Sequence, residues 1–254
     1  MDGKYCKHKV KNQNYQKMKK RNRIWIYPFI QFGIAIILCI SCGKDDFDPP
    51  SDFVTDIDGN VYSIITIGTQ KWMKENLKTT RYLNGDSIET TSPATFNIGK
   101  ESSPKYQWAS GGDKSNVAAY GRLYTWYVVT DSRKICPKGW HIPSDEEWTV
   151  LIDFLGGEAI AGSKLKETGT IHWSSLNEDA TNESDFTALP GGYRSYTKYF
   201  MNFGKNGYWW SSEVYGESFS WIRGVSYNST EVSRTFNYGM GAYSIRCIKD
   251  PAVE

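Results

Sequence analysis

The chain has 254 residues, of which 39% are hydrophobic, 23% charged and 15% aromatic. This composition supplies enough apolar side chains for a core, and it excludes collagen, a coiled coil and a wholly disordered chain. The sequence contains 23 Gly and 17 Tyr, and no shift in composition separates two cores. It therefore predicts one loop-rich domain with appendages.

The formal net charge of +2 hides an uneven distribution along the chain. Residues 1–41 contain nine Lys or Arg and one acidic residue, which leaves 21 basic and 27 acidic residues and a net charge of −6 for the rest. A protein that binds nucleic acid needs a basic face to displace counterions from phosphates. The acidic body therefore argues against nucleic acid as a partner.

Residues 1–41 are expected to form a signal peptide. A basic stretch is followed by an apolar segment, Ile24 to Ser41, and then by Cys42, which gives a charged region, a hydrophobic region and a small residue before a cysteine. Met18 precedes three basic residues and is an alternative start. An uncleaved membrane anchor is the other interpretation of the segment, although Pro28 and Gln31 interrupt it.

The segment resembles a bacterial lipoprotein signal, in which Cys42 becomes the lipidated N-terminal residue. Cys39 occupies a position that is usually Leu, whereas Ser41 fits the pattern. Residues 42–53 then form a tether, and the run 43–46 resembles the signal that sends lipoproteins of Bacteroidetes-type bacteria to the outer face of the outer membrane. We therefore expect a surface-exposed lipoprotein attached to the outer membrane through its lipid.

The body begins with a predicted hairpin, in which Val61 to Ile67 and Lys71 to Met73 are the strands and residues 68–70 the loop. A helix is expected from Ala118 to Thr130. A clearer helix follows Ser144, because Ser144 and Glu147 form a capping box before apolar residues at helical spacing, and Gly156-Gly157 ends it. Strands are expected at 208–211, 220–223 and 243–248. This order of elements predicts an α+β fold.

Eight short motifs in the body carry a resemblance to a known family. They are Asp56–Tyr62, Trp72–Leu77, Tyr120–Trp126, Cys136–Ser144, Glu147-Trp148, Phe186–Arg194, Trp209–Ser212 and Ser244–Cys247. Over residues 54–250 the chain resembles the Fibrobacter succinogenes major paralogous domain family. That resemblance implies a C-type-lectin-like fold with short twisted antiparallel sheets, two helices and long irregular loops. It also implies a distant likeness to formylglycine-generating enzymes, and a family whose members are mostly surface or secreted proteins without an assigned activity.

Two cysteines remain once the leader residues and Cys42 are set aside. Cys136 and Cys247 are expected to form a disulfide, because thiols of an exported domain pair and the implied topology returns the last strand to the centre of the fold. The alternative is a copper-binding cysteine pair such as formylglycine-generating enzymes use. Their cysteines lie near one another in the chain, whereas these two are 111 positions apart.

The sequence assigns no catalytic residue and no cofactor. His141 and His172 lack the spacing of a triad or a zinc site, so both are interpreted as hydrogen-bonded packing residues. The segment Asp56 to Asn60 is read as a tight turn, because it lacks the distal Glu of a calcium loop. The acidic segment 177–185 could bind calcium through Asp179, Glu183 and Asp185, or it could be an ordinary solvated loop.

Aromatic residues crowd the segment from 193 to 227. Neighbouring residues of a strand point to opposite faces, so Trp209 and Trp210 are not expected to belong to the core together, and one of them is expected to face outward or to lie under a loop. Together with Tyr193 and Trp221 they are the candidate ligand-binding residues, because flat rings stack on sugars. Packing of irregular loops by aromatics is the alternative.

The sequence therefore predicts a non-catalytic domain that binds an extracellular glycan, a polysaccharide or a protein. Two further hypotheses stay open: a structural or adhesin component of the cell surface, and an oxidase related to formylglycine-generating enzymes.

Overall fold

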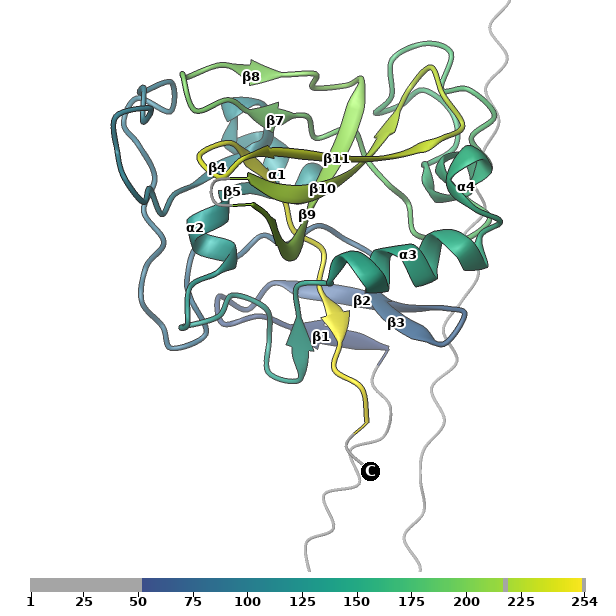
Figure 1. The fold of residues 1–254 in the computed structure, drawn as a ribbon, viewed down its shortest axis with the longest axis horizontal. Coiled ribbons are helices and arrows are strands. Elements are labelled where there is room, and N and C mark those ends of the chain that lie inside the picture. Colours follow the sequence, from purple (N-terminus) through teal and green to yellow (C-terminus); the bar gives the residue numbers. More distant parts are fainter. Residues whose placement is uncertain (1–51, 217–218, 253–254) are drawn as a thin grey trace, which may run out of the picture. The chain divides into compact units, whose positions relative to one another are not determined.

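The computed structural model describes residues 52–216 and 219–252 (Figure 1). The predicted signal peptide, Cys42 and the tether up to Ser51 lie outside these residues. Within the described part of the chain, no helix is long and apolar enough to cross a membrane.

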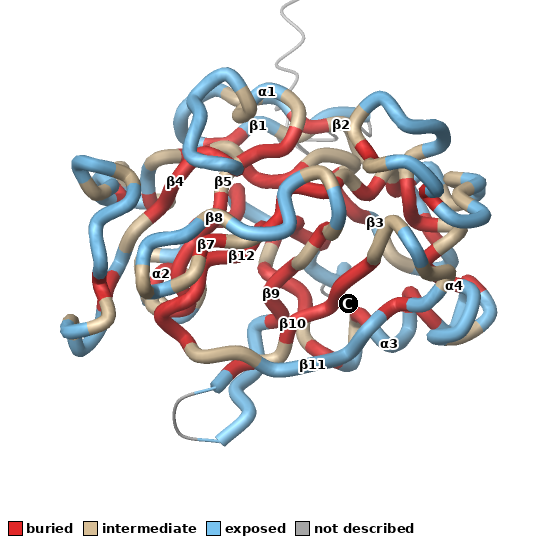
Figure 2. The backbone as a smooth tube through the Cα atoms, turned by 90° about the horizontal axis from the view of Figure 1, so that it is seen from above, coloured by how far each residue is buried: buried red, intermediate tan, exposed pale blue. Residues whose placement is uncertain are grey.

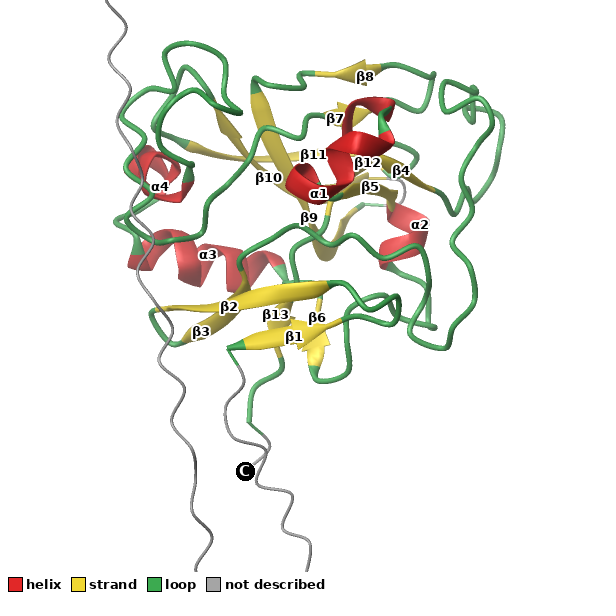
Figure 3. Cartoon of the chain, turned by 180° about the vertical axis from the view of Figure 1, so that it is seen from behind, coloured by secondary structure: helices red, strands yellow, loops and turns green. Residues whose placement is uncertain are grey.

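Strands predominate over helices, and the strands form two curled sheets that are largely antiparallel (Figure 3). The fold is therefore α+β, as predicted. The helices are α1 (Val117–Tyr120), α2 (Trp126–Val129), α3 (Asp145–Phe154) and α4 (Glu158–Leu165), with two short 3-10 turns at Ser110–Gly112 and Lys114–Asn116. The strands are β1 (Phe53–Thr55), β2 (Val61–Ile67), β3 (Gln70–Met73), β4 (Gln107–Ala109), β5 (Arg122–Thr125), β6 (Trp140–His141), β7 (Tyr193–Arg194), β8 (Phe200–Met201), β9 (Asn206–Tyr215), β10 (Phe219–Ser226), β11 (Val232–Tyr238), β12 (Ala242–Ser244) and β13 (Ile248–Lys249).

The smaller sheet has five strands in the order β1-β2-β3-β13-β6. Its β2–β3 hairpin is the one that the sequence predicts, and Ile64 to Ile67 pair with Met73 to Gln70. β13, the last strand of the chain, lies between β3 and β6. The end of the chain is thereby held among its earliest strands (Figure 3).

The larger sheet has eight strands, with the path β11-β10-β9-β12-β5-β4 and with β7 and β8 attached beside β12. Its described pairings are antiparallel except for β12 with β9, which is parallel. β11 is an outer strand, and the residues from Ser233 to Phe236 on it are exposed (Figure 2). Because β11 is an edge strand, side chains of the hairpins β9–β10 and β10–β11 lie at the surface.

α3 forms as the sequence predicts. The Ser144 hydroxyl accepts a hydrogen bond from the Glu147 amide, and the Glu147 carboxylate accepts one from the Ser144 amide. Gly156 and Gly157 follow the helix with φ of 103° and 94°, which a side chain would disfavour. α3 packs between the two sheets, because Trp148 and other buried residues of α3 share a core cluster with residues of β2, β3, β9 and β10.

The predicted helix from Ala118 to Thr130 is wrong in its middle. Gly121 has φ of 71°, and a Cβ there would lie 2.7 Å from the Cβ of Asn76. The chain leaves α1 at this glycine and continues as β5, which pairs with β4 and β12. Leu123 is buried as the helix pattern required, yet sheet pairing decides its conformation.

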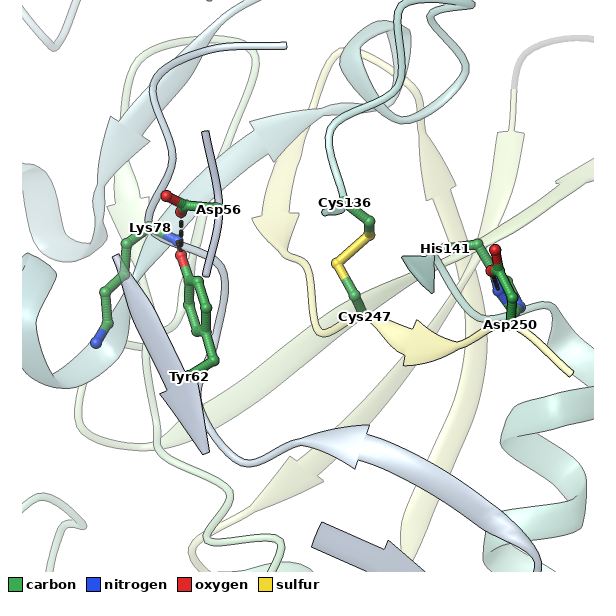
Figure 4. Close-up of a disulfide and its surroundings, with 7 residues drawn as sticks. All are labelled: Asp56, Tyr62, Lys78, Cys136, His141, Cys247 and Asp250. Carbon is green, nitrogen blue, oxygen red and sulfur yellow. Dashed lines mark hydrogen bonds and ion pairs between the residues drawn. A yellow bond between two sulfur atoms is a disulfide. The ribbon is translucent and has the colours of Figure 1, made fainter. Parts of the chain in front are cut away.

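A disulfide joins Cys136 and Cys247, with an S–S distance of 2.04 Å and a Cα–Cα distance of 6.0 Å (Figure 4). Both cysteines are buried in the main core cluster. The bond connects the segment before β6 to the segment before β13, across 111 positions of sequence. The predicted pairing is confirmed.

Candidate functional site: an aromatic surface and a tyrosine pocket

Trp209 and Trp210 are both buried in core clusters, with 2% and 0% of their surface exposed, so the prediction that they cannot both belong to the core is wrong. They do point to opposite faces of β9, and each joins a different core cluster. The Trp209 indole donates to Asn76 Oδ1 at 2.8 Å, and the Trp210 indole donates to the Tyr124 carbonyl at 2.7 Å. Because other elements cover β9 on both sides, neither ring is available as a surface platform.

The aromatic surface lies instead on β10 and β11 and at the end of β9. We use this name for five rings: Tyr215, Phe219, Trp221, Phe236 and Tyr238. In the sheet register Phe219 is opposite Tyr238 and Trp221 is opposite Phe236, so these four side chains share one face. The Tyr215 ring lies 4.3 Å from Phe236 and 4.5 Å from Trp221, measured between centroids.

Several of these rings are open to solvent. Tyr215 is 43% exposed, Phe219 40% and Phe236 43%, while Trp221 and Tyr238 are half-buried. Side chains this large and apolar are usually withdrawn from water, and an exposed cluster of them marks a binding surface more often than a single exposed ring does.

An ion network at the start of α3 supports the aromatic surface. The Arg234 guanidinium lies 3.6 Å from the centre of the Trp221 ring and forms an ion pair with Asp145 at 2.8 Å. Asp145 is the first residue of α3 and also binds Arg223 at 2.8 Å. The hydrogen bond that Arg234 donates to Asp145 raises the pKa of Arg234, whereas burial lowers the pKa of Arg223. These contacts tie the surface to α3 and hold Trp221 in place before any ligand arrives.

A cavity of about 160 Å³, which we call the tyrosine pocket, lies on the other face of the β10–β11 pair, the face to which Ile222 and Thr235 point. The rings of Tyr193 and Tyr243 stack at 5.4 Å, and Tyr208 lies edge-on to both. Of the four predicted ligand-binding residues, Tyr193 therefore lines a cavity and Trp221 lies in the aromatic surface. The pocket is lined by Tyr193, Asn202, Tyr208, Ile222, Thr235, Phe236, Asn237 and Tyr243.

The three phenol groups of the pocket differ in their hydrogen bonds. The Tyr193 hydroxyl donates to Met201 Sδ at 3.2 Å, and the Tyr208 hydroxyl accepts from Asn202 Nδ2 at 3.2 Å. The Tyr243 hydroxyl is buried and has no hydrogen-bond partner among the described residues. Burial raises the pKa of both Tyr208 and Tyr243, so these phenols stay protonated and can donate a hydrogen bond.

His141 lines a cavity of about 260 Å³, and Glu147 and Asp250 line a second cavity of about 370 Å³. The Nδ1 of His141 is 2.7 Å from an Asp250 oxygen (Figure 4). Its Nε2 is 2.9 Å from a Glu147 oxygen. Hydrogen bonds to the carboxylates of Glu147 and Asp250 raise the pKa of His141. An imidazole that donates to two carboxylates carries both protons, so this histidine joins α3 to the segment after β13 as a charged brace.

His172 is also hydrogen-bonded, to Glu167 at 2.8 Å, and it packs edge-on against Tyr120 at 5.4 Å. Both histidines are hydrogen-bonded, as the sequence analysis expects. Asp56 likewise forms the predicted tight turn. It accepts hydrogen bonds from the Asp58 and Asn60 amides and from the Tyr62 hydroxyl, which in turn accepts one from the Lys78 amide (Figure 4).

The acidic segment 177–185 does not assemble the predicted calcium ligands. Glu183 pairs with Lys164 at 3.5 Å and Asp185 pairs with Lys74, so these two carboxylates have different partners. Among residues 52–216 and 219–252, no group of three or more His, Cys, Asp or Glu could hold a metal ion. The ammonium group of Lys166, a buried lysine, donates a hydrogen bond to the backbone carbonyl of Glu178 in this segment.

Sequence reasoning missed Phe219, Phe236 and Tyr238. The last two lie beyond the aromatic-rich segment, in the run Arg234 to Tyr238, where large and polar side chains alternate. That alternation is the signal of a strand with one distinct face, and it could have identified them.

Comparison with protein families gives one match. The model of the Fibrobacter succinogenes major domain matches residues 65–249, which include both sheets apart from β1 and part of β2. Searches of curated proteins and of solved structures found no similar protein. Because the match covers most of the chain, this protein belongs to the Fibrobacter succinogenes major domain family.

Proposed function

We propose that this protein is a non-catalytic, C-type-lectin-like domain that binds a glycan, in particular a polysaccharide, on its aromatic surface. The observation that carries the proposal is the set of exposed rings on β9, β10 and β11, with Trp221 stacked under Arg234 and fixed through Asp145. A sugar ring presents a flat face of C–H groups, and such a face packs well on aromatic side chains.

The shape of the surface favours a polymer over a small molecule bound in isolation. The rings follow two neighbouring strands, so successive sugar units can stack on successive side chains. Because the ion network already orders Trp221 and Arg234, little side-chain freedom is lost on binding. An extracellular protein is the second candidate ligand, since tyrosine and tryptophan also make good protein contacts.

The C-type-lectin-like assignment is part of the proposal. It is supported by the curled antiparallel sheets, by the few helices and by the last strand, which lies between two strands from earlier in the chain. The long connection from Lys166 to Gly192 contains little regular structure, as the loops of such folds do.

Two substitutions in the aromatic surface test the function. Phe236→Ala and Trp221→Ala should each weaken binding to the polysaccharides that the wild type recognises, by about tenfold or more, because central aromatic contacts carry most of a binding energy. Phe154→Ala is the matched control, since Phe154 is a 64% exposed phenylalanine on α3, outside the aromatic surface. Affinity electrophoresis in a panel of soluble polysaccharides gives the readout, with circular dichroism to check folding.

Two results would overturn the proposal. One is that the wild type binds no glycan in the panel. The other is that Phe236→Ala and Trp221→Ala bind as well as Phe154→Ala does. Binding to cell-envelope proteins in the absence of glycan binding would favour the second candidate.

We also propose that Cys42 carries a lipid that anchors the protein at the surface of an outer membrane. The support is the sequence pattern of residues 1–46, in which a basic stretch and an apolar segment precede Cys42. Cys42→Ala should move the protein from the membrane fraction to the soluble fraction. Membrane retention of the variant would contradict lipidation at this cysteine.

A further inference from the structure

The cavity of about 260 Å³ beside β6 shares no residue with the aromatic surface. Its walls are apolar and largely withdrawn from water. They include the disulfide-bonded Cys136 together with Ile135, Trp140 and Ile142, which are all between 3% and 8% exposed. Cavities with apolar walls and a few convergent polar groups are the usual form of small-molecule sites. The walls therefore suit a ligand with an apolar body.

The polar residues of this cavity are more exposed than its walls. Lys134, Ser212 and Asp250 are exposed, and His141 is half-buried. The cavity is thus apolar inside and polar at its rim. A ligand that matches both parts carries its polar group at one end and an apolar group at the other.

One charge at the rim is left without a partner in the protein. The two ring nitrogens of His141 are occupied by the carboxylates of Asp250 and Glu147, so the charge of Asp250 is already offset. Lys134 forms no ion pair with any residue of 52–216 or 219–252. The lysine is therefore the group that can pair with a ligand, and the ligand it selects is an anion.

The backbone conformation of Lys134 is unusual for a lysine. Its φ of 56° lies in the left-handed region, which Gly and Asn adopt more readily. Residues held in such conformations cluster at sites where a side chain has a role. Asp131, three positions earlier in the same turn, pairs with Arg133 and Lys105 and not with Lys134. The turn thus holds a lysine at the cavity without neutralising it.

We propose that this cavity binds a small organic carboxylate with an apolar ring, whose carboxylate pairs with the Lys134 ammonium and whose ring packs against Trp140 and Ile142. The cavity has the volume of roughly nine water molecules at about 30 Å³ each, which is enough for one ring system with a short side chain. Inorganic phosphate or sulfate would meet the lysine but would leave the apolar walls unfilled. The inference goes beyond glycan binding and does not depend on it.

An NMR titration of the purified protein with indole-3-acetate and with its uncharged amide tests the site. The two probes share the ring, so the difference between their affinities measures the effect of the carboxylate. We expect indole-3-acetate to bind and to shift the indole N–H signal of Trp140. The amide should bind roughly threefold to fivefold more weakly, the effect of one ion pair near the surface.

Lys134→Met separates the ion pair from the packing of the ring. The variant should bind indole-3-acetate as weakly as the amide, and its affinity for the amide should equal that of the wild type. Lys138→Met is the matched control, because Lys138 is also exposed, lies four positions later and does not line the cavity. Both lysines are exposed, so neither substitution should move the urea midpoint appreciably.

Three results would overturn the proposal: no binding of indole-3-acetate, equal affinity for the acid and the amide, or equal affinity of Lys134→Met and Lys138→Met for the acid. A shift confined to Trp221 would also contradict it, because the probe would then lie on the aromatic surface. A Trp140 shift, together with a loss of affinity in Lys134→Met alone, supports the site. Because the probes contain no sugar, these results and those of the polysaccharide assays can fail separately.

Discussion

Replacement of Lys166 by methionine is expected to destabilise the fold strongly. Lys166 is fully buried, and its ammonium group donates to three backbone carbonyls, those of Glu178 at 2.9 Å, Ser226 at 3.0 Å and Ser229 at 2.8 Å. One acceptor lies in the acidic segment, and the other two lie where β10 turns toward β11. Burial lowers the pKa of Lys166, and the negative charges of Glu178 and Asp179 oppose this shift.

The expected loss of unfolding free energy follows from the three carbonyl groups that Lys166→Met leaves without a hydrogen-bond donor. Methionine is close to lysine in shape, so the Lys166→Met variant keeps the packing and removes the charge and the donors. Three carbonyls then lose their partner, and each buried polar group without one costs about 1–3 kcal/mol. The desolvation penalty of the ammonium is also removed, which offsets part of this loss. We therefore expect the free energy of unfolding to fall by about 3–5 kcal/mol.

Urea denaturation followed by tryptophan fluorescence measures this loss by linear extrapolation. Lys164→Met is the matched control, because Lys164 is a partly exposed lysine in the last turn of α4, two residues before Lys166, and its ion pair with Glu183 is 3.5 Å long. An exposed pair of this kind contributes about 1 kcal/mol or less. If Lys166→Met loses no more stability than Lys164→Met, the hydrogen bonds of the buried Lys166 ammonium do not stabilise the fold as the structure indicates.

Three further predictions concern the covalent and charged ties of the core. Replacing Cys136 and Cys247 by Ala should lower the free energy of unfolding by up to about 4–5 kcal/mol in the chain-entropy model, and an intact mass that does not change on reduction would contradict the disulfide. Because the pKa of His141 is raised in the folded state, its stabilising contribution is full below the unfolded pKa of about 6.5 and is lost as the pH rises through the folded value. The urea midpoint of the wild type should therefore fall more than that of His141→Gln as the pH is raised through this range. Identical pH profiles of the two urea midpoints would refute this. Tyr62→Phe should cost about 1.5–3 kcal/mol, since it removes a hydrogen bond to the buried carboxylate of Asp56; an unchanged unfolding midpoint would argue against that bond.

Elements with local signals could be predicted from the sequence. The α3 helix needs only the capping box at Ser144 and Glu147, the apolar spacing and two glycines, all within a short segment. The β2–β3 hairpin needs only β-branched residues around a tight turn. The disulfide follows from the number of cysteines and the expected export.

Features that depend on distant contacts could not be predicted. The helical pattern around Leu123 is overridden because Gly121 passes close to Asn76 and the next residues pair with β12 and β4. The alternation at Trp209 and Trp210 correctly places the rings on opposite faces, but the sequence does not show that both faces are covered. The aromatic surface itself depends on the register of β10 with β11.

The most direct test of glycan binding on the aromatic surface is an NMR titration that follows the tryptophan indole N–H signals. A polysaccharide that binds the wild type should shift the signal of Trp221, because this ring lies in the aromatic surface. The signals of Trp209 and Trp210, whose indoles donate to partners inside the core, should stay in place. Polysaccharide binding that leaves Trp221 unchanged and instead perturbs Trp140, beside the 260 Å³ cavity, would contradict the proposed site.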